Sequence, residues 1–291
     1  NLGIIFGAMA SALIGNKFKI NKAPPLEYLK GLLGGALMGF GAALAAGCNV
    51  GGFYSAVAMF DPGGLTMMLG LLAGAYLGLR YLLWEMDHVR IGTKLRARPE
   101  GRGPVREYST LKRVAGAALF ILVLVAFQIY AWQGETQLGG LVFFGFLIGL
   151  VMHRGRFCFA NAFREPFMTG DGRMMRAVLT SLMIYALGSA VIKWSYIQPP
   201  GAGVYHPYML GSPLGGLIFG VGMILAGGCA SGTLWRAGEG HIKLWIALAG
   251  FTLSNSLSVS WIAGSGFKQW LGNPVLLPDF FAWQPTLIFY F

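Results

Sequence analysis

Apolar residues in this chain come in long blocks that polar links separate. The blocks cover residues 2–15, 31–47, 65–84, 114–132, 138–152, 174–194, 214–228 and 241–263. Several of them approach the roughly 20 residues that an α-helix needs to cross a bilayer. This pattern predicts an all-α polytopic membrane protein, whose helices cross the lipid bilayer several times.

Shorter pieces lie between these blocks. One covers residues 53–60 and ends at Asp61-Pro62-Gly63-Gly64, and an amphipathic piece covers residues 153–166. A third follows Cys229 as far as Glu239, and residues 264–283 form a mixed stretch. Pieces of this length are typical of interrupted or re-entrant helices, because they are too short to span a bilayer.

The composition separates the membrane class from its main alternative, a soluble protein with one large helical core. Hydrophobic residues make up 55% of the chain and charged residues 11%, against about 25% charged in soluble domains. The net charge of +11 could suggest nucleic acid, but nine of the 22 Lys and Arg residues fall between Arg80 and Arg113. In a membrane protein such a cluster is a topology signal, and we expect no nucleic-acid partner.

One stretch of the chain occurs twice. Residues 34–51 and 215–232 share six glycines and one cysteine at a constant offset of 181 residues, which pairs Cys48 with Cys229. A single Gly-Cys-x-x-Gly motif could arise by chance in a glycine-rich chain, but the repetition of the whole glycine register is unlikely to be accidental. The chain therefore contains an internal repeat. The equivalent of Cys158 at this offset would precede Asn1, so its partner, if it has one, lies outside this sequence.

The basic residues orient the two copies. The links 16–30 and 85–113 carry Lys and Arg and are expected on the cytoplasmic side, whereas the links 133–137 and 195–212 carry none and are expected outside. The first copy then runs outward and the second inward. This predicts inverted-topology repeats, in which broken or re-entrant short helices meet near the midplane of the membrane.

The predicted organisation has three parts. Residues 1–84 form the first repeat, residues 85–113 form a cytoplasmic basic loop, and residues 114–291 hold the second repeat and the C-terminal helices. Asn1 and Phe291 both lie inside apolar runs. We therefore expect both ends to be cut, and the first repeat to lack its N-terminal part.

The glycines have two expected roles. Small residues one helical turn apart allow close contact between helices, and six glycines fit this role: Gly35, Gly39, Gly41, Gly216, Gly220 and Gly222. Four others flank the paired cysteines and can break a helix, so that its N-terminal end points at an anion: Gly47, Gly51, Gly228 and Gly232. The alternative is that all of them are packing glycines around a small buried cysteine.

The three cysteines, Cys48, Cys158 and Cys229, form no disulfide framework. No Cys-x-x-Cys motif or neighbouring His accompanies them, so we predict no metal site. Catalysis by a thiol requires a base beside it, and the sequence places none beside Cys48 or Cys229. We expect no cofactor, since the histidines are scattered near loops: His88, His153, His206 and His241. A thiol in an apolar pore is a weak, polarizable donor that suits a soft, sulfur-bearing solute. A buried cysteine can also be an inert small hydrophobe.

Charged residues lie close to two of the cysteines. Arg154, Arg156 and Arg164 surround Cys158, and Arg236 and Glu239 follow Cys229. Charged groups near membrane depth are hypotheses for function. For Arg154 and Arg156, anchoring at the membrane interface is the alternative.

These motifs together resemble the YeeE/YedE family, the sulfur transport domain. The similarity rests on three segments: residues 39–49, residues 156–165 and residues 220–240, which end with Arg236-Ala-Gly-Glu239-Gly240. The resemblance implies a permease of the bacterial inner membrane, built as an hourglass of spanning and re-entrant helices. It implies that thiosulfate passes along Cys48, Cys158 and Cys229 through S–H···S hydrogen bonds. The expected supporting residues are Gly47, Asn49, Gly51, Gly228, Gly232, Arg164, Glu165, Arg236 and Glu239.

The resemblance also implies a partner and leaves the solute open. Family members work with small TusA-like sulfur carriers on the cytoplasmic side. The details look nearer to the YedE branch, which is linked to selenium metabolism, so a selenium compound is the alternative solute. Two other classes remain open: a membrane thiol or redox enzyme, and a purely structural subunit.

Overall fold

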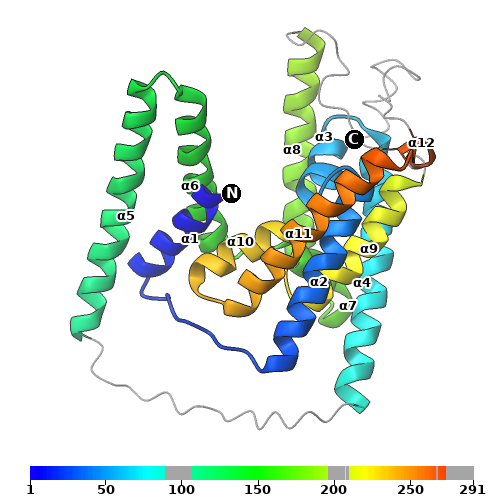
Figure 1. Ribbon diagram of the computed structural model, residues 1–291, viewed down its shortest axis with the longest axis horizontal. Coiled ribbons are helices and arrows are strands. Elements are labelled where there is room, and N and C mark those ends of the chain that lie inside the picture. Colours follow the sequence, from blue (N-terminus) through cyan, green and yellow to red (C-terminus); the bar gives the residue numbers. More distant parts are fainter. Residues whose placement is uncertain (89–105, 196–206, 208–209, 267, 273–291) are drawn as a thin grey trace. The chain divides into compact units, whose positions relative to one another are not determined.

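The computed structural model describes residues 1–88, 106–195, 207, 210–266 and 268–272. Within these residues the regular structure is helical, apart from an isolated bridge between Asn21 and His241. Figure 1 shows the elements in order: α1 (Leu2–Ile14), α2 (Pro25–Leu44), η1 (Asn49–Ser55), α3 (Ala56–Ala58), α4 (Pro62–His88), α5 (Arg106–Trp132), α6 (Thr136–Gly155), α7 (Phe159–Met168), α8 (Arg173–Ser195), α9 (Gly211–Ala226), α10 (Ala230–Glu239), α11 (Ile242–Gly264) and α12 (Lys268–Leu271). The predicted all-α class is confirmed.

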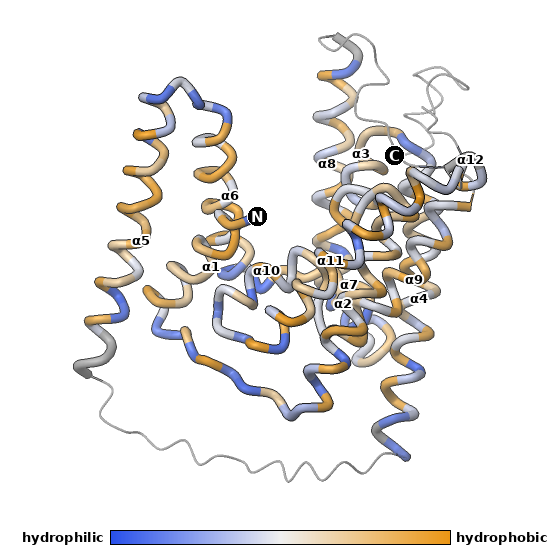
Figure 2. The backbone as a smooth tube through the Cα atoms, in the orientation of Figure 1, coloured by the Kyte–Doolittle hydropathy of each residue, from blue (hydrophilic) through white to orange (hydrophobic). Residues whose placement is uncertain are grey.

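The helices have the length and composition of membrane spans. Six segments of the described chain qualify, namely Pro62–Glu85, Thr110–Trp132, Thr136–Met168, Arg173–Lys193, Gly211–Glu239 and Ile242–Gly264. A seventh qualifies if α2 and the pair η1–α3, bent by 44° relative to each other, count as one span. Figure 2 shows apolar residues along α5 and α6 and polar residues where the two helices join. The chain is a polytopic membrane protein.

Several helices extend beyond the apolar blocks that predicted them. Helix α2 begins at Pro25 rather than at residue 31, because proline is well suited to the first turn of a helix. The predicted loop 85–113 is shorter than expected, since α4 continues to His88 and α5 begins at Arg106. Charged and polar residues with good helix propensity extend a span past its apolar part. Residues 89–105 and 273–283 lie outside the described residues.

The chain divides into two compact units. Unit 1 comprises Asn1–Pro24, Leu82–Cys158 and Ser231–Trp245, and unit 2 comprises the remaining residues. This division follows packing and differs from the predicted division at residues 84 and 113, which follows sequence similarity and stays a prediction.

In unit 1, glycines bring α1 against α5 and α6. A Cβ atom added to Gly3 would lie 2.5 Å from the carbonyl oxygen of Val142 in α6, and one added to Gly116 of α5 would lie 2.7 Å from the Ile14 side chain. Phe146 fills the space between these helices together with Ala10 and Val123. Unit 1 therefore depends on backbone-to-backbone contact along α1.

In unit 2, α2 and α9 cross through glycines on both helices. A Cβ atom on Gly41 would lie 2.6 Å from the Gly215 carbonyl oxygen, and one on Gly222 would lie 2.7 Å from the Gly34 carbonyl oxygen. The early part of each helix thus meets the late part of the other, so the two helices are antiparallel. At the offset of 181 residues Gly34 corresponds to Gly215 and Gly41 to Gly222, so the two contacts exchange with each other. This internal two-fold relation is what an inverted repeat produces.

The outer helices of unit 2 repeat the same relation. A Cβ atom on Gly220 of α9 would lie 2.9 Å from the Ala75 amide nitrogen in α4, and one on Gly39 of α2 would lie 2.8 Å from the Asn255 amide nitrogen in α11. Ala75 and Asn255 are therefore equivalent at an offset of 180, one residue less than in the central helices. The six glycines expected at helix contacts are all buried at such contacts.

Candidate functional site

Each cysteine ends a short break between a long helix and a short one. Cys48 separates α2 from η1, Cys158 separates α6 from α7, and Cys229 separates α9 from α10. The residue after each cysteine begins the next helix. All three cysteines thus occupy the position directly before a helix N-terminus.

The backbone of the three breaks is also the same. Each contains one residue in the left-handed region, namely Ala46 with φ 55°, Arg156 with φ 51° and Gly227 with φ 83°. The next amide donates to the carbonyl five residues back: Gly47 to Ala42 at 2.9 Å, Phe157 to Met152 at 3.3 Å and Gly228 to Met223 at 3.1 Å. This is the Schellman ending of a helix. The break at Cys158 is therefore a third copy of the motif, in which Arg156 and Phe157 replace the small residues.

The segment after Cys48 differs from the other two. Residues 49–55 form a π-helix rather than an α-helix. This conformation is rare in proteins overall, but where it occurs it is often part of a functional site. Asn49 is fully buried, and its amide group makes no hydrogen bond within the described residues. A Cβ atom on Gly51 would meet no atom within 4 Å, so this turn faces open space.

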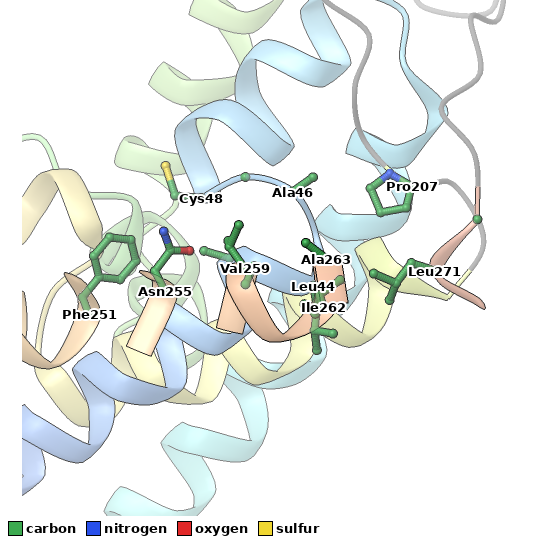
Figure 3. A pocket seen from close by; sticks show the side chains of 14 residues that line it. Leu44, Ala46, Cys48, Pro207, Phe251, Asn255, Val259, Ile262, Ala263 and Leu271 are labelled. Carbon is green, nitrogen blue, oxygen red and sulfur yellow. The ribbon is translucent and has the colours of Figure 1, made fainter. Parts of the chain in front are cut away.

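A cavity of about 590 Å³ lies beside Cys48 in unit 2 (Figure 3). Its wall comes from the end of α2, the break at Gly47 and Cys48, and the helices α11 and α12. Most of the lining is apolar, and the Asn255 amide lies at the same end of the cavity as Cys48 in Figure 3. The equivalent of Asn255 in the other repeat is Ala75, so helix packing at this position does not require a polar side chain. The amide of Asn255 is therefore an additional polar group at this end of the cavity.

The residues on both sides of Cys158 contact the short helices that follow the other two cysteines. In unit 1, Trp235 of α10 donates its indole N–H to the Phe157 carbonyl oxygen at 2.8 Å. In unit 2, the Phe159 ring packs against Tyr54 and Phe53 of η1, with ring centroids 5.8 and 6.2 Å apart. Each contact lies within one unit. Phe157 thus contacts the segment after Cys229 within unit 1, and Phe159 contacts the segment after Cys48 within unit 2.

The predicted charged residues fall into two groups. Arg164 and Glu165 lie half-buried on α7, where Arg164 donates to the Asn161 side chain at 3.4 Å. Arg236 and Glu239 lie on α10, and Glu239 accepts from Arg156 at 3.1 and 3.2 Å. Figure 1 labels the helices that carry both groups.

The structure brings some predicted residues together and separates others. Gly47 and Cys48 line the same cavity, whereas Gly228 and Gly232 are buried around the second break. Because α2 and α9 are antiparallel, the breaks at Cys48 and Cys229 follow opposite ends of this helix pair. Cys158 and Cys229 are fully buried, and Cys48 is half-buried.

Two polar residues were missed by the sequence interpretation. Asn255 was overlooked inside an apolar block, although it replaces the Ala75 of the other repeat. His153 was set aside as a loop histidine, but it lies near the end of α6 with 2% of its surface exposed. Its Nδ1 atom is 2.8 Å from the Ser11 hydroxyl, and its Nε2 atom is 3.6 Å from Glu239. His206 lies outside the described residues.

Comparisons with known proteins show which proteins this chain resembles in sequence. Escherichia coli and Salmonella typhimurium proteins named as the probable transporter YedE are each 28% identical over 272 residues, which is 89% of this chain and 64% of theirs. The thiosulfate transporter TsuA of Escherichia coli is 41% identical over 134 residues, or 46% of this chain and 37% of TsuA. The chain thus spans less than two thirds of the length of these relatives. The sequence model of the family described as Sulphur transport matches residues 1–77 and 154–291, and the chain therefore belongs to the sulphur transport family.

Proposed function

We propose that this chain forms the transport core of a permease for a small sulfur-containing anion, with thiosulfate as the first candidate. The solute passes along Cys48, Cys158 and Cys229 by S–H···S hydrogen bonds. The permease belongs in the bacterial inner membrane, with the link 85–113 on the cytoplasmic side. The relative named as a thiosulfate transporter supports this solute class.

The observation that carries the proposal is the threefold occurrence of one local structure. Three long helices end in the same way, and each break ends in a cysteine that directly precedes a short helix. An inert packing cysteine needs no such repeated position. Non-helical backbone at membrane depth is tolerated where it lines a water-filled cavity, and a solute path requires such a cavity.

Cys158 is the middle member of the proposed path. Its neighbours Phe157 and Phe159 contact the helices that follow Cys229 and Cys48 respectively. Cys48 is the cysteine with partial exposure and a cavity of sufficient size for a small anion. We therefore propose that Cys48 receives the solute or releases it, and that Cys158 connects it to Cys229.

The wall of the cavity favours a soft solute. An apolar wall stabilises a polarizable sulfur atom that loses little hydration, whereas a hard, strongly hydrated anion such as sulfate pays a large desolvation cost. The Asn255 amide can donate hydrogen bonds to the oxygen atoms at the other end of thiosulfate. Recognition would thus be divided between a thiol for sulfur and an amide for oxygen.

A selenium compound is the second candidate, because the similarity to YedE covers 89% of the chain and the similarity to TsuA 46%. A selenium atom is soft like sulfur and would meet the same thiols. A small TusA-like carrier on the cytoplasmic side would accept the sulfur after entry.

Uptake of radiolabelled thiosulfate into liposomes containing the intact protein tests the proposal. Excess unlabelled thiosulfate is expected to abolish the signal, and sulfate is expected to leave it within about twofold of the control. Selenite and selenate distinguish the second candidate, which requires one of them to compete better than thiosulfate. Equal competition by sulfate and thiosulfate would contradict recognition by soft sulfur contacts.

A further inference from the structure

A buried group of ionisable side chains lies in unit 1. His153 and Glu239 have 2% and 6% of their surface exposed, and the His153 Nε2 atom is 3.6 Å from a Glu239 oxygen. Arg156 reaches both oxygens of the same carboxylate at 3.1 and 3.2 Å. The His153 Nε2 atom makes no hydrogen bond within the described residues. Glu239 thus faces one guanidinium group and one imidazole.

A small cavity of about 60 Å³ lies on the other side of His153, with Ser11, Lys17 and Arg154 in its wall. This volume exceeds the minimum for one water molecule, and the wall offers several polar partners. Ser11 lies 2.8 Å from His153 Nδ1 and accepts from Arg154 Nε at 3.2 Å. His153 therefore stands between a polar, water-sized space and the buried carboxylate.

We propose that His153 and Glu239 form the binding site of a proton that is transported together with the anion. The proposal rests on the proposed function and adds its energy source. An anion that enters a cell with a negative interior moves against the membrane potential, and a proton bound in the same cycle offsets part of that charge. Imidazole changes its charge near neutral pH, and pairs of His and acidic residues within membranes form proton relays.

The charges around the site are compatible with this role. Glu239 is the acidic group that faces His153, and the basic groups are Arg156, Lys17 and Arg154. On α10, Arg236 lies over the Trp235 ring, 5.3 Å from its centroid. A proton on the imidazole creates a second cation beside Glu239, which then competes with Arg156 for the carboxylate. A proton on Glu239 weakens the same Arg156 contact directly.

This competition connects the proton to the cysteine path. Arg156 is the left-handed residue of the break, two positions before Cys158, and its guanidinium group also lies 5.7 Å from the Trp235 ring centroid. Glu239 ends the short helix that begins after Cys229. Release of Arg156 therefore loosens the contact between the Cys158 break and α10. Coupling between the proton and the anion requires a contact whose strength depends on the protonation state, and the Arg156–Glu239 contact meets this requirement.

A purely structural role for the Arg156–Glu239 ion pair leads to a different expectation. The Arg156–Glu239 contact alone would hold the break, and it requires neither a histidine nor a water-sized cavity beside it. In that case substitution of His153 changes stability but leaves the relation between anion and proton movement unchanged. The two interpretations are therefore separable by a proton measurement.

The test uses the intact protein in liposomes that contain a pH-sensitive dye. Exchange of labelled for unlabelled thiosulfate at equal pH reports the transport path alone. Uptake with an interior one pH unit more alkaline reports proton coupling, which for one proton per anion raises accumulation by up to about tenfold. We expect the wild-type protein to show both the rise in accumulation and an acidification of the interior when thiosulfate is added.

The variants identify the residues. His153→Gln is expected to keep exchange within about threefold of wild type, and both His153→Gln and Glu239→Gln are expected to lose the response to the pH gradient. The matched control is His88→Gln, because His88 is exposed at the end of α4, where its Nδ1 atom lies 3.1 Å from the Trp84 carbonyl oxygen and its ring stacks on the Trp84 ring; it should behave as wild type.

Each outcome of these experiments either supports or overturns the proton site. Wild-type exchange without proton movement would overturn the proton site and leave the permease intact, and so would a full gradient response in His153→Gln. If both variants lose exchange through misfolding, the wild-type ratio of protons to anions decides alone, and a ratio of zero overturns the proposal. An absence of thiosulfate exchange in the wild-type protein would overturn the proposed function, and the proton site with it.

Discussion

The crossing of α2 and α9 through paired glycines leads to a prediction with a defined size. A Cβ atom added to Gly41 would lie 2.6 Å from the Gly215 carbonyl oxygen, and one added to Gly215 would lie 2.6 Å from the Gly41 carbonyl oxygen. Ordinary contacts of a Cβ atom begin near 3.4 Å. Gly41→Ala or Gly215→Ala therefore forces the helices apart locally by somewhat less than 1 Å, roughly the difference between these two distances.

The expected cost follows from two opposing effects. Overpacking of a close contact costs about 1–3 kcal/mol, and the higher helix propensity of alanine returns up to about 1 kcal/mol. Because the obstacle is a backbone oxygen at 2.6 Å, the cost lies near the top of its range, and we expect a net destabilisation of about 2 kcal/mol for either variant. The double variant should cost less than the sum of the two, because one separation of the helices accommodates both methyl groups.

The measurement is the temperature at which half of the detergent-solubilised protein survives as a monodisperse peak. A loss of 1 kcal/mol corresponds to about 2–4 °C for a protein of this size class. Gly188→Ala is the matched control, since a Cβ atom there meets no atom within 4 Å on the exposed side of α8. Equal stability of Gly41→Ala, Gly215→Ala and Gly188→Ala would refute the close crossing of the two repeats.

Three further predictions concern the site and its orientation. Asn255→Leu keeps the volume of the cavity wall but removes the amide, so thiosulfate uptake should fall about tenfold, as the loss of roughly 1.4 kcal/mol implies; Ser260→Ala on the exposed side of α11 should leave uptake unchanged, and equal uptake in the two variants would remove Asn255 from the site. Arg156→Ala leaves the buried Glu239 carboxylate without its guanidinium partner and should destabilise the protein by about 1–3 kcal/mol, a thermal loss that Arg154→Ala, which removes no partner of this carboxylate, should not reproduce. A thiol-reactive label at Gly101 should react from the cytoplasm and one at Gly203 from outside, although both lie outside the described residues; labelling of both from one side would contradict the inverted topology.

The sequence was most informative where one pattern decides the structure. Long apolar blocks predict spanning helices because a bilayer requires them, and the repeated glycines identify the helix contacts because only glycine allows a neighbouring backbone at such a distance. The antiparallel pairing of Gly34 with Gly222 agrees with the orientation that the basic links indicated. The ends of the helices were less accurate, since charged residues such as Glu85 and Arg106 continue a helix beyond its apolar part.

The third copy of the cysteine motif could not be found by comparing residue types. At Cys158 the left-handed position is Arg156 and the next residue is Phe157, where the other copies have Ala46-Gly47 and Gly227-Gly228. The shared feature is a backbone conformation and a hydrogen bond, which an arginine can adopt at the cost of about 1–2 kcal/mol. Sequence comparison detects the small residues that adopt this left-handed turn at little cost. It misses a copy in which a larger residue is kept in the same conformation by the contacts around it.

The buried polar residues were hidden for a different reason. His153 follows an apolar block and precedes a basic cluster, so its pattern is that of an interfacial loop. Its burial depends on Ser11 and Glu239, which are 142 and 86 positions away in the chain. No local pattern contains such contacts. Asn255 was within reach of the repeat comparison, because an offset of 180 in place of 181 aligns it with Ala75.

The initial rate of thiosulfate uptake in cysteine variants is the most direct test of the proposed path. Cys48, Cys158 and Cys229 are each replaced by alanine and by serine in the intact protein, which is reconstituted at equal amounts after a check that it elutes as the wild type does. Alanine leaves only a small void at a buried cysteine, so the fold should survive. Serine keeps a donor, but its hydroxyl is hard and well hydrated where the thiol is soft.

We expect all six variants to insert and remain monodisperse while their uptake falls to the level of empty liposomes. Serine is not expected to rescue any position. Near-normal uptake in both Cys48→Ala and Cys229→Ala would contradict the proposed path, because it would reduce the paired cysteines to packing residues at the ends of two helices.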